Sequence, residues 1–216
     1  MNRIRLAAIA CAAFLVGCNE GEGQGSVDSD LLYVRDCWKG PFHLEPTFFA
    51  SDPFADTQQI RIQRGDRMVG VSDGVLLVVN NVTKIRNESL GKALPLGMPV
   101  GVHPPGFPIV PEDHPPDVSL MLYLYDTCHL QNGALYSVGG TITFNSLFSG
   151  NRNENDADDR LTDATFDATV TDPRDATVSS GDNGEPRIDY VTEHESRVTG
   201  NFHFFFERGI PAQPFP

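Results

Sequence analysis

The segment RVTGNFHFFFE, residues 197–207, has the alternation that decides the fold. Val198, Phe202, Phe204 and Phe206 fall on one face of an extended chain, while polar side chains fall on the other. A repeat of two is typical of a β-strand with one buried and one wet face. Burial of one phenylalanine contributes about 2–3 kcal/mol. The three phenylalanines are therefore predicted to lie at the centre of the core.

Similar short runs, rich in β-branched and aromatic residues and separated by turn residues, occur along most of the chain. No segment has a convincing long helical period. Serial strands without helices between them predict an all-β fold, an antiparallel β-sandwich or, as the alternative, a β-barrel. The predicted strands cover 31–37, 46–50, 59–64, 74–79, 118–126, 140–148, 164–172 and 197–207.

Long connections interrupt these strands. Residues 95–117 hold half of the 16 prolines, which lack the N–H that a ladder needs, so an extended surface connection is predicted. Residues 149–163 and 173–187 are polar and are predicted to be loops. Long loops in compact domains often carry function.

The chain begins with a basic pentapeptide and a short apolar run. MNRIR carries two arginines and no acid, and LAAIACAAFLVG (6–17) is uncharged. Twelve helical residues rise about 18 Å, too little for a bilayer core of about 30 Å. The pattern predicts a secretory signal peptide over residues 1–17.

The end of this run, Leu15-Val16-Gly17-Cys18, resembles the lipobox of bacterial lipoprotein precursors. The resemblance implies that Cys18 receives a diacylglyceryl group, becomes the first mature residue and gains a further acyl chain such as palmitate. Several acyl chains hold a protein stably on a membrane. Asn19, in place of the aspartate that retains many such proteins at the inner membrane, implies the outer membrane. Whether the body faces the periplasm or the cell surface is left open.

Residues 18–30 contain NEGEGQGSVDSD, which offers no large side chain for burial. This composition predicts a flexible tether between the lipid and a single β-rich domain over residues 31–216.

The remaining cysteines of the exported chain are Cys37 and Cys128. Each ends an apolar run, and neither belongs to a CxxC pair that would favour a metal. In an exported protein such a pair predicts a disulfide.

Calcium is the one cofactor with a candidate sequence. Residues 149–163 contain Asn151, Asn153, Asn155, Asp156 and Asp158, and hard cations bind such oxygens. The loop lacks the turn glycine of a calcium loop and has Thr162 in place of the closing glutamate. A solvated loop with Asx turns is therefore preferred. Zinc is supported only by His103 and His114, too few ligands.

The net charge of −13 opposes nucleic acid as a partner, because phosphates repel an acidic chain. No catalytic residue is nominated: Gly70–Gly74 fits G-x-S-x-G, but Asp73-Gly74 predicts a hairpin turn instead. The preferred function is a non-catalytic, lipid-anchored envelope module that binds a protein or glycan or supports a structure. The alternatives are a metal-dependent envelope hydrolase and a calcium-binding adhesion-type domain.

Overall fold

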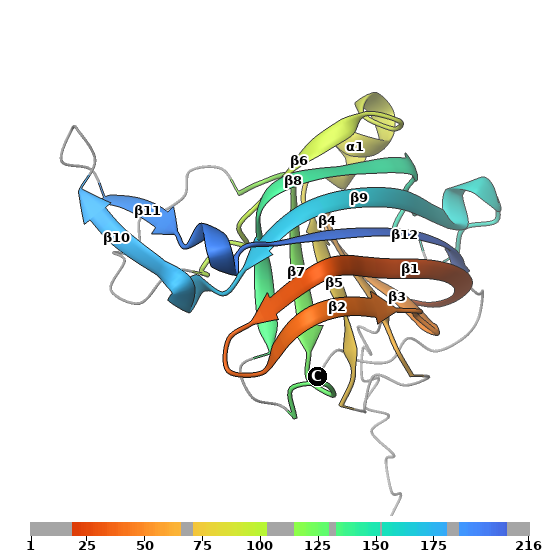
Figure 1. The fold of residues 1–216 in the computed structure, drawn as a ribbon. Coiled ribbons are helices and arrows are strands. Elements are labelled where there is room, and N and C mark those ends of the chain that lie inside the picture. Colours follow the sequence, from red (N-terminus) through yellow and green to blue (C-terminus); the bar gives the residue numbers. More distant parts are fainter. Residues whose placement is uncertain are drawn as a thin grey trace, which may run out of the picture.

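The computed structural model describes residues 19–65, 71–102, 115–129, 133–151, 153–180 and 186–206. Strands dominate these ranges, and one short α-helix and three single 3-10 turns accompany them (Figure 1). In chain order the elements are β1 (Asn19–Val34), β2 (Trp38–Leu44), β3 (Phe48–Phe54), β4 (Thr57–Gln63), β5 (Asp73–Val79), α1 (Val82–Glu88), β6 (Ala93–Gly97), β7 (Val118–Leu124), β8 (Ala134–Ser146), η1 (Asp158–Arg160), β9 (Leu161–Thr171), η2 (Pro173–Asp175), β10 (Ala176–Ser180), β11 (Pro186–Tyr190), η3 (Thr192–His194) and β12 (Ser196–Phe206).

The strands form two crossed layers, which confirms the predicted all-β sandwich. Strands β2, β1, β12 and β9 lie side by side in one layer, and β3, β4, β5 and β7 lie behind them (Figure 1). The long, curved β8 pairs with β9 and with β7 and so joins the layers. All strand pairings among the described residues are antiparallel except the short one between β6 and β7.

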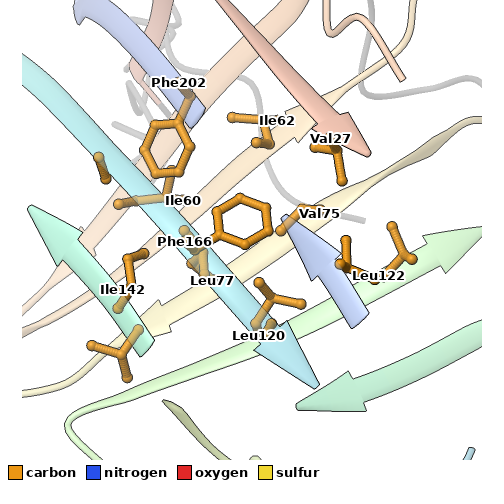
Figure 2. Packing of buried hydrophobic residues seen from close by; sticks show 14 of the residues in the cluster. Val27, Ile60, Ile62, Val75, Leu77, Leu120, Leu122, Ile142, Phe166 and Phe202 are labelled. Carbon is orange, nitrogen blue, oxygen red and sulfur yellow. The ribbon is translucent and has the colours of Figure 1, made fainter. Parts of the chain in front are cut away.

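The hydrogen-bonded pairing also runs around both layers without a break. β1 pairs with β12 along one edge and with β3 and β2 along the other. Such continuous pairing is a property of the barrel alternative too, but here side chains fill the interior. Figure 2 shows Phe166 and Phe202 packed among aliphatic side chains from β4, β5 and β7. The prediction for the C-terminal strand is confirmed, since Phe202, Phe204 and Phe206 are at most 3% exposed.

The predicted tether over residues 18–30 is wrong for every residue of it that the structure describes. Residues 19–30 belong to β1, and Gly21, Gly23 and Gly25 lie directly opposite Phe206, Phe204 and Phe202 of β12. The backbone of β12 comes so close that a Cβ on Gly25 would lie 2.5 Å from the carbonyl oxygen of Asn201. The glycines are therefore required by the packing of the sheet, and their lack of side chains does not make the segment flexible.

Five further elements lie where the sequence predicts loops or nothing regular. They are β2, α1, β6 at the start of the proline-rich connection, and the hairpin β10–β11 in the second polar loop. The hairpin stands away from the main body (Figure 1), and β10 is largely exposed. The predicted Asp73-Gly74 turn is also wrong, because these residues begin β5. No helix within the described ranges is long and apolar enough to cross a membrane.

The predicted disulfide is present: Cys37 and Cys128 are bonded, with Cα atoms 5.6 Å apart. Cys37 follows β1 and Cys128 follows β7, so the bond ties the two layers together. The buried carboxylate of Asp73 holds the second cysteine's loop in place. It accepts hydrogen bonds from the backbone N–H groups of Asp126 and Thr127, at 3.1 and 3.0 Å, and from the Thr127 hydroxyl at 2.6 Å.

Candidate ligand-binding site

A hollow of about 400 Å³ lies where β7 and β9 end and β8 begins. Two tyrosine rings, an aspartate–arginine pair and two glycines shape it. Its lining comprises Gly101, Val102, Tyr125, Gly133, Ala134, Tyr136, Asp172, Pro173 and Arg174. Concave sites with aromatic walls and a few fixed polar groups are the usual places for ligands to bind.

The register of β8 and β9 and a capped turn build the polar side of the hollow. Tyr136 pairs with Thr171, which places its strand next to Asp172, the first residue after β9. The Asp172 carboxylate caps η2 by accepting the backbone N–H of Arg174 at 2.9 Å. Pro173 occupies the first position of the turn, where no N–H is needed.

The Arg174 side chain folds back onto the same carboxylate. Its Nε lies 2.9 and 3.0 Å from the two Asp172 oxygens, and its Nη2 also donates to Oδ2. This hydrogen bonding raises the pKa of Arg174 above its ordinary value. Since Asp172 is 3% exposed at its side chain, the pair presents the guanidinium rather than the carboxylate to solvent.

A second aspartate buried beside the hollow, Asp175, contacts an arginine and a histidine. Arg35 Nη1 lies 3.2 Å from Asp175 Oδ1 and donates a further bond to the Arg174 carbonyl. His194 Nδ1 lies 3.3 Å from Asp175 Oδ2 without the alignment of a hydrogen bond. The imidazole is stacked on Tyr33, with ring centroids 4.1 Å apart. These contacts hold the ends of β1, β9 and β12 together.

The tyrosines supply the binding surface. Tyr125 is 36% exposed, and partial burial raises the pKa of the Tyr136 phenol. The phenol therefore stays neutral at ordinary pH and serves as a hydrogen-bonding group. Tyrosine rings offer an apolar face with a polar edge. The carboxylates are held in ion pairs, so the arrangement suits the binding of a ligand with both apolar and hydroxyl-bearing faces better than proton transfer.

In the asparagine- and aspartate-rich loop, side-chain oxygens bond to the loop itself. Asn151 Oδ1 accepts the N–H of Asn153, and Asp156 Oδ1 accepts the N–H of Asp158. The Glu154 carboxylate accepts the N–H groups of residues 155 and 156, which lowers its pKa. Asn155 and Asp158 contribute backbone donors here. The geometry is that of successive Asx turns, the arrangement preferred for this loop from the sequence.

We expect calcium to leave the stability of the protein unchanged. A ligand that binds only the folded state raises the melting temperature, but these oxygens already accept local hydrogen bonds. Thermal unfolding in millimolar calcium chloride should match unfolding in magnesium chloride of equal ionic strength. A selective rise with calcium that Asp156→Asn abolishes would instead assign a calcium site to the loop.

Several candidates fall outside the described residues: Cys18, Gly70, and His103 and His114 with their acidic neighbours. Among the residues that the structure does describe, no group of three or more histidine, cysteine or acidic side chains is placed to hold a metal ion. The Ser72 hydroxyl donates to the carbonyl of Arg64 at 2.5 Å and lies just before β5, so no helix follows it as a nucleophile elbow requires.

The residues of the hollow come from four separate segments and were not nominated from the sequence. One local signal was present, since Asp172-Pro173 is a turn-forming pair directly after a predicted strand. Nothing in the sequence order indicates that Tyr125 and Tyr136 face this turn. Comparison of the chain with protein-family models, curated proteins and solved structures found no match.

Proposed function

We propose that this chain is a lipid-anchored protein of the bacterial cell envelope, with a non-catalytic body that binds a protein or glycan. The observation that carries the proposal is the disulfide between Cys37 and Cys128, because a bond of this kind fits the export that the leader sequence predicts. The lipobox-like sequence that ends at Cys18 supplies the anchor. Asn19, the residue after that cysteine, pairs with Ser51 of β3, so the anchor would adjoin the sheet directly.

The disulfide supports export. Disulfides persist in oxidising compartments such as the bacterial periplasm and the cell surface, and are rare in the cytosol. The bond between Cys37 and Cys128 crosses between the layers and closes a long stretch of chain. The choice of the outer membrane for the anchored body rests on Asn19, which stands where many inner-membrane lipoproteins have aspartate.

The hollow beside η2 supports binding over catalysis. Asp172 and Asp175 are nearly fully buried and are paired with Arg174 and Arg35. Carboxylates held in this way fix the local fold, whereas a general acid or base must exchange protons with a substrate. The exposed tyrosine rings then provide the contact surface. The net charge of −13 opposes the electrostatic attraction on which nucleic-acid binding depends.

Replacing Cys18 with serine tests the anchor. In bacteria fed labelled palmitate, the native chain should incorporate label and fractionate with membranes. C18S should accumulate at full length, with residues 1–17 attached and without label, because the acyl acceptor is the sulfur. The matched control is Cys11→Ser, which removes the leader's other cysteine and should be labelled normally. Equal labelling of C18S and the native chain would refute the proposal.

A further inference from the structure

The start of β1 is fixed within the sheet and lies beside an exposed aromatic residue. Asn19 pairs with Ser51 of β3, and Gly21 pairs with both β3 and β12. Three residues beyond Ser51, or about 10 Å along the strand, β3 ends at Phe54. The Phe54 side chain is 75% exposed, the highest value among the large hydrophobic residues that the structure describes.

Phe54 ends β3 and directly precedes Ala55 and Asp56, the two-residue turn that joins β3 to β4. Phe54 pairs with Thr57, and Ala55 has a φ of 52°, which gives a tight connection that projects from the sheet. Asp56 fastens the turn to α1, because its carboxylate accepts the N–H of Thr83 at 2.8 Å and its carbonyl accepts the N–H of Val82. The aromatic ring is therefore carried on a braced turn next to the first residue after the proposed anchor.

We infer that the β3–β4 turn, with Phe54 beside it at the end of β3, rests against the lipid surface that holds the anchor. This inference depends on the proposed function, because the anchor at Cys18 is what brings the turn to a bilayer. Since Asn19, one residue after Cys18, pairs with Ser51 of β3, and Gly21 is paired on both edges, only a short length of chain separates the anchor from the sheet. The acyl chains retain the protein, and Phe54 sets the orientation of the body.

The charges around the turn define the kind of lipid surface. Asp52 and Asp56 flank Phe54, and the hydrogen bond from Thr83 lowers the pKa of Asp56, which keeps it ionised. Anionic headgroups repel such a turn, so a surface of zwitterionic lipids fits it. Burial of a phenylalanine contributes about 2–3 kcal/mol, too little to hold a protein alone but enough to orient one already anchored.

A tryptophan beside the opposite end of β1 serves as an internal reference for contact with lipid. Val34, the last residue of β1, pairs with Trp38, which is the single tryptophan of the chain and is 39% exposed. Fifteen residues of strand separate Asn19 from Val34, roughly 50 Å if fully extended. In the proposed orientation Trp38 stays in water while Phe54 contacts lipid.

Tryptophan fluorescence tests the orientation in the lipidated, full-length mature protein. Two single-tryptophan proteins are compared in phosphatidylcholine vesicles with brominated upper acyl chains: the native chain and the double variant Phe54→Trp, Trp38→Phe. The double variant should show blue-shifted, quenched emission, and the native chain should show neither change. Addition of phosphatidylglycerol should reduce the quenching. Matching melting temperatures establish that the exposed substitutions leave the fold intact.

A linker variant separates the rigid attachment from the anchor itself. Insertion of about ten glycine and serine residues between Cys18 and Asn19 gives the body a reach of about 18 Å. Flotation with vesicles should persist, while the quenching of the double variant falls. If the native chain and the double variant both float with the vesicles but the double variant is quenched no more than the native chain, the orientation is refuted and the anchor stands. If neither floats, the anchor fails and the proposed function fails with it.

Discussion

Replacement of Gly23 by alanine is expected to destabilise the protein by about 3 kcal/mol or more, which lowers the melting temperature by roughly 10 °C. Gly23 lies opposite Phe204, and a Cβ at this position would overlap the His203 carbonyl oxygen and lie 2.6 Å from the Phe204 Cα. Both obstacles are backbone atoms of β12, so no rotamer change relieves them. The two strands would have to separate along their shared edge. Urea unfolding monitored by circular dichroism measures the loss.

Gly139→Ala is the matched control. Gly139 also lies within a strand, but a Cβ there meets no atom within 4 Å. Alanine restricts the unfolded chain more than glycine does, so this substitution should be neutral or stabilise by up to about 1 kcal/mol. Equal stability of Gly23→Ala and Gly139→Ala would show that β1 does not pack against β12 as described, and that the glycine-rich segment is loose after all.

Removal of the disulfide by the double substitution Cys37→Ala, Cys128→Ala is expected to cost about 4–5 kcal/mol. The bond joins residues separated by 91 positions, and a cross-link over such a span removes much of the entropy of the unfolded chain. Cys128 is also 5% exposed within the core, so truncation of its sulfur loses packing. Urea unfolding of the double variant and the native chain measures the difference.

Reduction provides the control for this experiment. Native protein in excess dithiothreitol should unfold at nearly the same urea concentration as the double variant, and dithiothreitol should leave the double variant unchanged. Alkylation of both thiols in the folded native protein without reductant would contradict the bond. A double variant within 1 kcal/mol of the native protein would show that the bridge contributes little to stability.

The sequence predicts those strands whose inward positions carry large side chains. In β12 and β9 inward phenylalanine, alanine and valine alternate with mostly polar residues, and Phe166, Ala168 and Val170 are buried as predicted. The same reasoning misses the first half of β1, because the hydrophobic group that fills its inner face belongs to β12. Glycine also recurs at every second position, at residues 21, 23 and 25. A search for alternating hydrophobic residues does not detect this repeat.

Other elements escape prediction for different reasons. Strand β10 has little buried surface, so no alternation marks it. Helix α1 spans only seven residues. A helical repeat is recognised over a window of about 11 residues or more. Strand β2 contains Gly40-Pro41, which is typical of a turn, and lies at an edge of the sheet, where proline is tolerated.

The candidate functional residues likewise divide into those that the sequence predicts and those that it does not. The bond between Cys37 and Cys128 was predictable because thiol chemistry and the export predicted from the leader both favour it. The hollow was not, since Tyr125, Tyr136 and Arg174 meet only through the register of β7, β8 and β9. Long-range pairing of this kind leaves no trace in local composition.

The pairing of β1 with β12 sets the order of events during biogenesis. A chain that crosses the inner membrane amino end first exposes β1 at once, yet the partner of Gly21 is Phe206, at the far end of the described fold. Contacts so distant in sequence form slowly. In the proposed lipoprotein, modification of Cys18 would therefore precede folding, and the body would stay unfolded until most of the chain has been secreted.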